Sequence, residues 1–546
     1  MARSNVEREI KLEAGVGFSL PPLDDVAPGA QVVAKPELAM QTVYFDTPDL
    51  RLMRSGVTLR HRQERQLGPG GEPGPPVNEW TLKLPDDSAS PAGTGVLLVR
   101  RELTWTAPRS SLPHEADSMV RALRRTVPLG PVARMSTHRR RHRLVDADGQ
   151  ALAEIDDDVV SVMDGRRLAA RFREIEVEVA DAAPEEIGGA LAEVLVSAGA
   201  RRSDGRPKVV RARGSRATEA PDVCRVRPGR DATLAEVVAG AIADGFLRLL
   251  ANDPGVRLDE DPENVHRARV ATRRLRSDLR TFRDLVDPAW LRATRGELGW
   301  VASALGEVRD ADVLTEGLRH QIASLSEADA GAAAWLITSV IKQRERARAA
   351  LLQVLDSDRY LQLLDRLADA AVALPPPPQA EAPGAADEGA QPGQPAPPAT
   401  APAMVLDAPA HKVAGAIVVK PWRHLERAVS ELGDEPDDED LHEVRIRAKR
   451  LRYACEALAG TAGEPAAAMA VAAARLQTVL GDFHDAVVAE AWLRGVGAEA
   501  SPLDAMVAGQ LITLERQSAA AGRKEWRGAW KELDRKRLRS WLARAR

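Results

Sequence analysis

The chain has little cysteine: of its 546 residues only Cys224 and Cys455 are cysteines, far apart and without a Cys-x-x-Cys partner. This excludes a disulfide framework and a cysteine-based zinc site, and it suits a reducing compartment, so we expect the cytoplasm. Long apolar runs are also missing, since no stretch approaches the roughly 18 residues that cross a bilayer. Charges stand at the N-terminus where a signal peptide needs an apolar core. We therefore expect neither a membrane span nor export.

Two common phosphate-binding sequences are absent as well. No Gly-Lys dipeptide occurs, which excludes a Gly-x-x-x-x-Gly-Lys loop, and no Gly-x-Gly-x-x-Gly follows a strand-like run. Aromatic residues make up only 3% of the chain, and the formal net charge is -4. This balance gives no general attraction to nucleic acid or to membranes. Any polyanion site must therefore be a local cluster of Arg and Lys.

The length exceeds what one hydrophobic core usually serves, which predicts two or three domains. The first two-fifths of the chain contain short β-patterned runs separated by Gly and Pro clusters, with two helix-like stretches between them. From Thr233 onward, segments rich in Ala, Leu and Arg have helical periodicity. We expect an α+β fold with a β-rich domain at 1–215, a linker at 216–230 and an all-α domain at 231–546.

The helical part is an internal repeat around a proline-rich insert. Residues 265–282 resemble 441–458 at an offset of 176, and residues 305–313 resemble 480–488 at an offset of 175. Between the repeats, ten of 28 consecutive residues are proline, so this segment cannot pack as helix or strand. We predict two similar helical bundles joined by a disordered insert at 374–408.

Several β-patterned runs are charged along one face and apolar along the other. Glu7, Glu9 and Lys11 point to one face of the first run, and Ile10 and Leu12 point to the other, because side chains alternate along a strand. The same alternation recurs around 60–62, 81–83, 100–102 and 174–178. One such strand is ordinarily an amphipathic strand with a solvated face. Its repetition favours a small barrel or tunnel with a polar interior and helices covering the apolar outside.

The charges in these runs also sort by type. Acidic trios stand on the first and last runs, and Arg and Lys stand on the runs between them. Carboxylates suit hard divalent cations, whereas Arg and Lys suit phosphate oxygens. Together they describe a metal-bridged polyphosphate pocket, in which the metal offsets phosphate charge and the basic side chains hold the phosphate chain.

This half of the chain resembles the CYTH superfamily, the triphosphate tunnel metalloenzymes, whose hallmark is Glu-x-Glu-x-Lys near the N-terminus. Glu7, Glu9 and Lys11 match the hallmark in full. The further matching segments follow in order: YFDTPD (44–49), TLRHR (58–62), WTLKL (80–84), the Arg100/Glu102 pair, HRRRHR (138–143), AEIDDDV (153–159) and EIEVEV (174–179).

The resemblance implies an eight-stranded antiparallel β tunnel that hydrolyses inorganic triphosphate with Mg²⁺ or Mn²⁺, with Glu7, Glu9 and Lys11 as catalytic residues. The implied metal ligands are Glu7, Glu9, Asp158, Glu176 and Glu178. The implied triphosphate contacts are Lys11, Arg60, Arg62, Lys83, Arg100, Arg140 and Lys208. Pro207 stands before Lys208 where relatives usually carry Ser, and the sequence leaves open which arginines of 139–143 face inward.

The helical half carries two basic stripes. The first stripe consists of His266, Arg269, Arg273, Arg276 and Arg280, which fall within about 80° of one another on a helical wheel. The second stripe consists of His442, Arg445, Lys449 and Arg452 at equivalent positions of the second repeat. A solvated helix face normally mixes charge signs, whereas stacked like charges cost stability unless an anion neutralises them. We therefore expect a linear polyanion to lie across both stripes.

These helices resemble the CHAD domain, a histidine-containing helical module often found C-terminal to CYTH domains. The matching segments are VHRARVATRRLRSDL, LGEVRDADVL, LHEVRIRAKRLRY and LGDFHDAVVA. The resemblance implies that both stripes, together with His484, bind inorganic polyphosphate. A metal role for the histidines has less support because Arg and Lys crowd each of them. The Arg309-Asp310 and His484-Asp485 pairs can contact the anion or bond helices together, and both options stay open.

Three alternatives stand beside hydrolysis of inorganic triphosphate. The tunnel can bind polyphosphate without turnover, although a site for a polyanion alone has no use for at least five inward carboxylates. It can process a nucleoside or thiamine triphosphate, in the manner of adenylate cyclases or thiamine triphosphatases, although no base pocket is evident. The Arg-rich helices can bind nucleic acid, but they lack the interleaved aromatics of single-strand readers, so nucleic acid is less favoured. Nothing in the sequence sets the oligomeric state.

Overall fold

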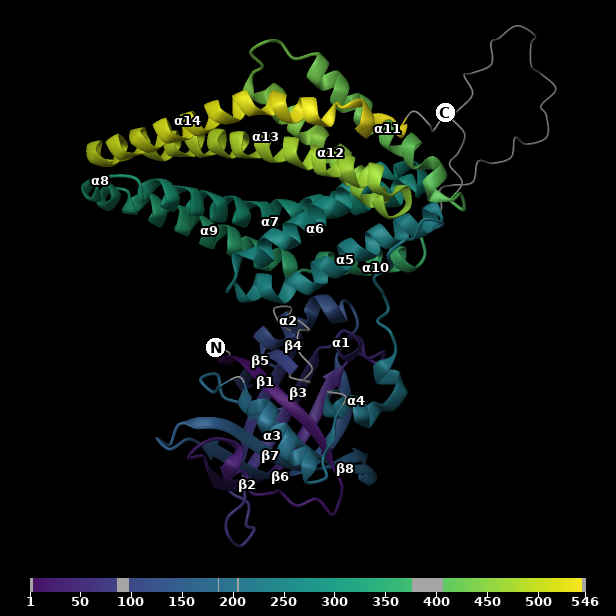
Figure 1. Ribbon diagram of the computed structural model, residues 1–546, viewed down its shortest axis with the longest axis vertical. Coiled ribbons are helices and arrows are strands. Elements are labelled where there is room, and N and C mark those ends of the chain that lie inside the picture. The colour runs from purple at the N-terminus through teal and green to yellow at the C-terminus, as the bar shows by residue number, and fades with distance from the viewer. Residues whose placement is uncertain (1–2, 86–97, 185, 204–205, 376–405, 543–546) are drawn as a thin grey trace, which may run out of the picture. The chain divides into compact units, whose positions relative to one another are not determined.

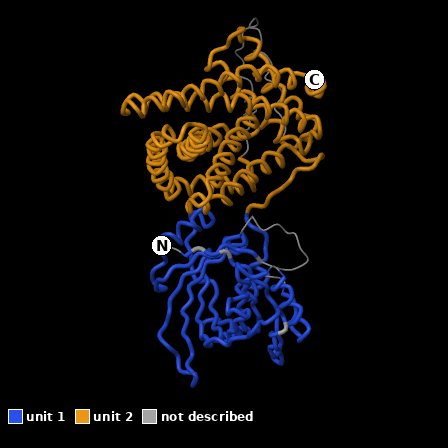
Figure 2. Tube along the Cα trace, turned by 60° about the vertical axis from the view of Figure 1, so that its left-hand side comes forward, with its two compact units in different colours: residues 1–222 blue, residues 223–546 orange. Residues whose placement is uncertain are grey.

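The structure is a computed structural model, which describes residues 3–85, 98–184, 186–203, 206–375 and 406–542. The chain divides into two compact units, residues 1–222 and 223–546, which we call the β unit and the helical unit (Figure 2). The division falls within the stretch 216–230 that the sequence assigns to a linker. Most of the expected insert at 374–408 lies outside the described residues.

The β unit is built on one antiparallel sheet in the strand order β5-β4-β3-β2-β6-β7-β8-β1-β9. Because β1 also pairs with β5, strands β1 to β8 close into a ring, and β9 is added beside β1 (Figure 1). The strands are β1 (Arg3–Ala14), β2 (Gln31–Asp46), β3 (Thr58–Gln66), β4 (Val77–Pro85), β5 (Leu98–Thr106), β6 (Gly130–Val145), β7 (Ala151–Asp164), β8 (Arg167–Val179) and β9 (Arg201–Arg202). This confirms the expected eight-stranded antiparallel arrangement.

Short helices and turns complete the β unit. They are η1 (Asp24–Val26), α1 (Arg51–Arg54), α2 (His114–Arg124), α3 (Glu186–Ser197), α4 (Lys208–Arg213) and η2 (Gly214–Thr218). Helix α3 packs on the apolar face of the sheet, where its Leu191 joins a buried cluster with Leu12 of β1 and Ile175 of β8. Period-two alternation turns the charged side chains of the same strands to the opposite face, toward the inside of the ring.

Helix α4 is held against the sheet by its second and third residues. Val209 and Val210 are buried with Met135 of β6 and Val160 of β7. Because these two valines are fixed, Lys208 at the first position of α4 is also held in place, and its side chain is buried. The helix therefore positions one lysine at the ring.

The helical unit contains two sets of helices. The first set is α5 (Leu234–Leu258), α6 (Pro262–Thr281), η3 (Arg283–Leu285), α7 (Pro288–Ile322), α8 (Glu327–Ala332), α9 (Ala334–Leu355) and α10 (Asp358–Val372). The second set is α11 (Ala410–Ser430), α12 (Asp438–Ala462), α13 (Glu464–Gly497), α14 (Pro502–Leu533) and α15 (Lys536–Arg539). None of the described helices is both long and apolar enough to cross a membrane.

The two sets pack in the same order. Helices α5, α6, α7 and α9 contact one another in succession, and so do α11, α12, α13 and α14. Asp261 caps α6 and Asp437 caps α12, so the matching sequences begin matching helices. Leu318 and Leu336 of the first set share one core with Leu493 of the second. The expected α+β class, with an all-α part made of two repeated bundles, is thereby confirmed.

Candidate functional site

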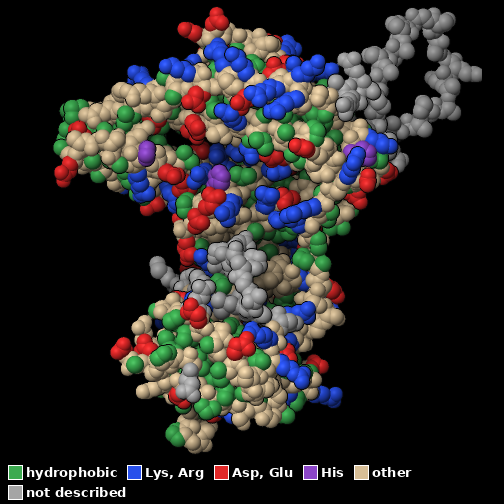
Figure 3. Space-filling view, in the orientation of Figure 1, with side chains coloured by type: hydrophobic (Ala, Val, Ile, Leu, Met, Phe, Trp, Pro, Cys, Tyr) green, Lys and Arg blue, Asp and Glu red, His purple; other side chains and the backbone are tan. Residues whose placement is uncertain are grey.

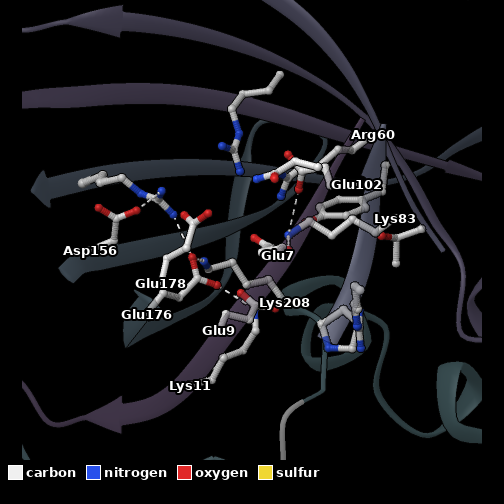
Figure 4. Close-up of a pocket in the computed structure, with 17 residues that line it drawn as sticks. Glu7, Glu9, Lys11, Arg60, Lys83, Glu102, Asp156, Glu176, Glu178 and Lys208 are labelled. Atoms are coloured by element: carbon white, nitrogen blue, oxygen red, sulfur yellow. Dashed lines mark hydrogen bonds and ion pairs between the residues drawn. The ribbon is translucent and has the colours of Figure 1, made fainter. Parts of the chain in front are cut away.

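A polar cavity of about 130 Å³ lies inside the ring, and every strand from β1 to β8 contributes to its wall (Figure 4). Its lining residues are Asn5, Glu7, Glu9, Lys11, Tyr44, Thr58, Arg60, Arg62, Lys83, Arg100, Glu102, Arg139, Asp156, Glu176, Glu178, Pro207 and Lys208. The structure thus brings together all but two of the site residues expected in this half. The two exceptions are Arg140 and Asp158.

Opposite charges pair across this cavity, and Lys11 is the clearest case. Its Nζ donates to Glu176 Oε1 at 2.6 Å and lies 3.3 Å from Glu9 Oε2. Lys83 pairs with Glu7 and lies 3.0 Å from Glu102 Oε2. These contacts join strands β1, β4, β5 and β8, so the cavity is internally neutralised by residues far apart in the sequence.

Lys208 and Glu176 form a second centre of ion pairs. Lys208 Nζ lies 2.7 Å from Asp158 Oδ2 and 2.8 Å from Glu176 Oε2. Burial opposes the negative charge of Glu176, but Lys11, Lys208 and Arg139 outweigh it and hold the pKa of Glu176 well below its usual range. Glu176 therefore stays ionised among its cations.

Other carboxylates of the cavity have the opposite character. Burial and the nearby carboxylate of Glu7 raise the pKa of Glu178 to about 7. Burial also raises the pKa of Asp156 to about 6, although Arg139 opposes that shift. These acids crowd one another with too little positive charge between them, and a bound cation would relieve that repulsion.

The donor set fits a hard divalent cation such as Mg²⁺ or Mn²⁺, because it consists of carboxylate oxygens. Glu9 Oε1 and Asp156 Oδ1 are buried without a hydrogen-bond partner, so each has a lone pair to offer. Within the described part of the chain, no three acidic, His or Cys residues are already grouped as ligands. These carboxylates pair with lysine and arginine instead.

The structure corrects the expectation for Arg140. Residues of β6 alternate, and Arg139 is the one that lines the cavity, where it pairs with Asp156 and makes two 2.7 Å contacts to Asp158. Arg140 lies on the other face, where its Nη2 is 2.9 Å from Asp157 Oδ2 and its side chain is 43% exposed. Because residues 139–141 are all arginine, the sequence alone could not show which of them faces the cavity.

Asp158 also differs from its expected role as a direct ligand. It is fully buried behind the cavity wall, where it holds Arg139 and Lys208 in position. Asp156, two residues earlier on the same face of β7, lines the cavity instead. The signal was available in the sequence, since both acids have the same parity along the strand.

Other lining residues were not expected as site residues either, and of these Glu102 and Tyr44 pair with expected ones. Glu102 pairs with Lys83, although the sequence only marked it as part of a matching segment. Tyr44, from the segment YFDTPD, hydrogen-bonds Arg60, and although burial opposes the shift, Arg60 and Lys208 lower the pKa of the Tyr44 hydroxyl. Alternation along the strand did not predict that the aromatic side chain of Tyr44 faces the cavity.

In the helical unit, the two basic stripes come together where α6 contacts α12. Figure 3 shows Lys and Arg side chains gathered in the hollow between its two layers of helices. Burial and then Arg273, Arg445, Arg269 and Arg276 lower the pKa of Lys449 to about 6. Cations of both repeats therefore surround Lys449.

The histidines sit at the same junction. His442 Nδ1 lies 3.2 Å from His484 Nδ1, and burial with Arg445 and His442 lowers the pKa of His484 to about 4. His266 has its pKa lowered by burial and by Arg309. The imidazoles thus stand among cations, which argues for contact with an anion.

Some members of the stripes are neutralised within the protein. Arg452 Nε donates to Glu456 Oε1 at 2.6 Å, so its charge is already matched. Arg269 Nη2 lies 3.0 Å from Asp310 Oδ1, a contact that bonds α6 to α7. Arg280 lies at the far end of α6, where its charge acts on Arg295 and Arg450.

Comparison with known protein families gives two matches along the chain. A CYTH domain matches residues 5–204, and a CHAD domain matches residues 240–494. Two uncharacterized proteins of Mycobacterium tuberculosis, MT2285 and Rv2226, are each 30% identical to this chain, over 97% of it and 97% of their own length.

Similar solved structures include PptA from Streptomyces chartreusis, with 24% identity and a TM-score of 0.42 over 55% of this chain and 99% of that one. The CHAD domain of the plant Ricinus communis has 23% identity and a TM-score of 0.44, covering 57% and 95%. HpAC1 from Hippeastrum, described as having a dominant triphosphatase activity, has 18% identity and a TM-score of 0.23, covering 38% and 95%. With both domain matches in this order and full-length relatives, the chain belongs to the family of proteins in which a CYTH domain is followed by a CHAD domain.

Proposed function

We propose that the β unit hydrolyses the terminal phosphoanhydride of inorganic triphosphate with Mg²⁺ or Mn²⁺, and that the helical unit binds polyphosphate. The observation that carries the first part is the composition of the cavity wall. Seven Lys and Arg side chains and six carboxylates line one enclosed space. Basic groups alone would serve a phosphate chain, and the added carboxylates suit the cation that accompanies its hydrolysis.

The ion pairs indicate how such a substrate would be received. Phosphate oxygens can replace the carboxylates around Lys11, Lys83 and Lys208, because these ammonium groups reach into the cavity from three elements. Arg60, Arg62 and Arg100 line the same cavity and give guanidinium donors to the phosphate oxygens. Binding is then an exchange of partners that needs little rearrangement.

The carboxylates released by this exchange would hold the cation. Glu7, Glu9, Glu176, Glu178 and Asp156 are the candidates, since all five line the cavity. When bound, Mg²⁺ or Mn²⁺ supplies a Lewis acid that offsets the charge of the phosphate oxygens. The arginines and lysines of this chain orient the phosphate chain and neutralise the leaving group, and the closed ring limits the access of bulk water.

The proposal for the helical unit rests on charge that the protein does not neutralise. Burial lowers the pKa of Lys449, and Arg273 of the first repeat and Arg445 of the second lie close enough to lower it further. A linear polyanion across α6 and α12 would remove this repulsion. Arg309 and Asp485 lie near the same junction, where each can contact the anion or a neighbouring helix.

The test is phosphate release from tripolyphosphate, ATP and thiamine triphosphate, each with Mg²⁺ and with Mn²⁺. We expect tripolyphosphate to have the highest kcat/KM and hydrolysis to stop when EDTA removes the cation. A higher kcat/KM for a nucleotide or for thiamine triphosphate would shift the function to that substrate. Binding of tripolyphosphate without turnover under either metal would make the cavity a binding site.

A further inference from the structure

The helical unit also contains a cationic cavity at the end of the first stripe, where Arg280 lines it. It has a volume of about 410 Å³ and lies among the end of α6, η3, α7, α11 and α12. Its lining residues are Ser277, Arg280, Thr281, Arg283, Asp284, Leu285, Arg295, Ala416, Ile417, Lys420, Pro421, His424, Arg447 and Arg450. This volume is in the range of cavities that bind small organic molecules.

The charge of this cavity is strongly unbalanced. Six Lys and Arg side chains face a single carboxylate, Asp284, which pairs with Arg283 at 3.5 Å. Arg447 donates to Glu443 at 2.7 Å. The other four cations, Arg280, Arg295, Lys420 and Arg450, form no ion pair with any acid among the residues that the structure describes.

These uncompensated charges repel one another. Burial and then Arg280, Arg276 and Arg450 lower the pKa of Arg295, whose Nε is buried without a hydrogen-bond partner. Burial also lowers the pKa of His424, beside Arg447 and Lys420. Like charges held this close destabilise the folded chain unless an anion lies between them.

The equivalent place in the first repeat is neutralised. At the offset of 176, Lys420 corresponds to Asp244 and Arg450 corresponds to Arg274. Asp244 pairs with Arg248 at 2.8 Å, and Arg274 pairs with Glu456 at 2.9 Å. The positions equivalent to Lys420 and Arg450 are therefore neutralised in the first repeat, whereas a linear polyanion bound along the repeated stripes would use both repeats.

One side of the cavity is apolar. Leu285 and Ile417 are 1% and 8% exposed, and Ala416 and Pro421 complete this side. An inorganic anion would leave these groups without a partner, but a phosphate ester can place its organic part there and its phosphates on the arginines. We propose that this cavity is a separate site for an organic diphosphate or triphosphate. It requires no activity of the β unit, because none of its residues lines the ring.

The probe is ADP, titrated by calorimetry into the full-length protein without divalent cation. The test variant combines Arg295→Ala with Lys420→Ala. Its matched control combines Arg292→Ala with Arg423→Ala, which removes two exposed cations from the same helices, α7 and α11, outside the cavity lining. We expect the test variant to lose at least about tenfold in ADP affinity and the control less than about twofold.

A third variant, Arg269→Ala with Arg273→Ala, separates this cavity from the stripes and should retain the ADP affinity of the parent. Equal ADP affinity in test and control variants would overturn the proposal, and so would an equal loss in the stripe variant. Pyrophosphate that binds the cavity as tightly as ADP would overturn the organic part. Folding is read from the melting temperature, which ADP should raise in the parent and in the control but not in the test variant.

Discussion

The side chains of Glu7 and Glu9 contribute to the cavity and not to the packed core of the β unit. Both line the cavity, and neither belongs to the apolar cluster on the other face of β1. We expect the double change Glu7→Gln and Glu9→Gln to lower triphosphate hydrolysis by roughly 100-fold or more, because it removes two of the carboxylates proposed to hold the cation. The melting temperature should stay close to that of the parent. The measurement is phosphate release with Mg²⁺, beside a thermal melt.

Glu13→Gln is the control for this change. Glu13 lies on β1 as well, but its side chain is 44% exposed and pairs with Arg211 at 3.1 Å. Hydrolysis should be retained in this variant. A Glu7 and Glu9 double variant that works at the parent rate would remove the catalytic assignment of the cavity.

Arg139 and Arg140 offer a comparison between neighbours on opposite faces of one strand. We expect Arg139→Gln to reduce kcat/KM for tripolyphosphate by about 100-fold, since its guanidinium lines the cavity and a lost charge-stabilising donor has effects of that order. Arg140→Gln should change kcat/KM by less than about twofold. Steady-state kinetics of the two variants measure these changes in kcat/KM. A larger loss of kcat/KM in Arg140→Gln than in Arg139→Gln would reverse the assignment of faces.

Lys449 gives a prediction about pH. Its pKa is about 6 in the folded protein, against roughly 10.4 in an unfolded chain. Between these values the unfolded chain binds the proton that the folded one does not, so stability rises with pH across this window. We expect Lys449→Met to flatten the rise and to stabilise the protein at pH 7 by about 1–3 kcal/mol, since partial exposure weakens the effect.

Urea denaturation of the parent and of Lys449→Met at pH 6, 7, 8 and 9 measures this difference. Lys412→Met, which replaces an exposed lysine of α11, is the control and should keep the pH dependence of the parent. Parallel stability curves for the parent and Lys449→Met would contradict the prediction.

At the scale of helices, the contact of α6 with α12 makes one cationic surface from two repeats. Arg269→Glu with Arg273→Glu should weaken binding of long-chain polyphosphate, and adding Arg445→Glu with Lys449→Glu should weaken it further. Binding of the parent should decrease as salt rises, because a polyanion releases counterions when it binds, and each lost phosphate contact should reduce the salt slope by about one.

The measurement is titration of the full-length protein with polyphosphate at two salt concentrations, with duplex DNA as competitor. Arg267→Glu with Arg319→Glu is the control, because both side chains are exposed on α6 and α7 outside the stripes. Unchanged affinity in the quadruple variant would make the stripes an ordinary solvated face. Tighter binding of DNA than of polyphosphate would favour nucleic acid.

The same elements show what the sequence could predict. Alternation of Glu9 with Ile10 identified the two faces of β1, because a strand has a period of two and α3 buries the apolar side. Alternation could not predict which side chains of β6 face inward, because arginine occupies both faces of that strand. The pairing of Arg139 with Asp158 on β7 shows which face is the inner one. The repeated helices were readable because their caps and stripes recur.

Contacts between distant segments were not readable in this way. The pairing of β1 with β5 closes the ring, but no local sequence pattern in either strand predicts this pairing. The second cavity likewise combines residues of α6, η3, α7, α11 and α12. Of these residues, only Arg280 belongs to a stripe that the sequence pattern identified. Such places depend on tertiary packing, which a single sequence pattern does not encode.

At the scale of the whole molecule, the proline-rich composition predicts that residues 376–405 can be replaced by a short Gly-Ser linker with a change in melting temperature of less than about 2 °C. The flanks should be kept, because Pro375 accepts a hydrogen bond from the Asp287 amide and Leu406 accepts one from Ala235. Thermal melts of parent and shortened protein test this. A fall of several degrees would show that the segment packs.

A longer deletion that also removes 406–408 is the matched comparison. Ala408 accepts a hydrogen bond from the Leu234 amide at 3.0 Å, so its loss uncaps the start of α5. This variant should melt below the shortened protein. Equal melting temperatures would mean that the start of α5 needs no such support.

The closure of the ring through β1 has a consequence for how the protein folds. β1 pairs with β5, which begins at Leu98, and with β8, which begins at Arg167. Both of these partners lie far from β1 along the chain, whereas β2, β3 and β4 follow one another and pair in turn. Because pairing between segments far apart in the sequence costs the most loop-closure entropy, we expect the Glu-x-Glu-x-Lys segment to reach its place in the ring later than β2, β3 and β4 pair.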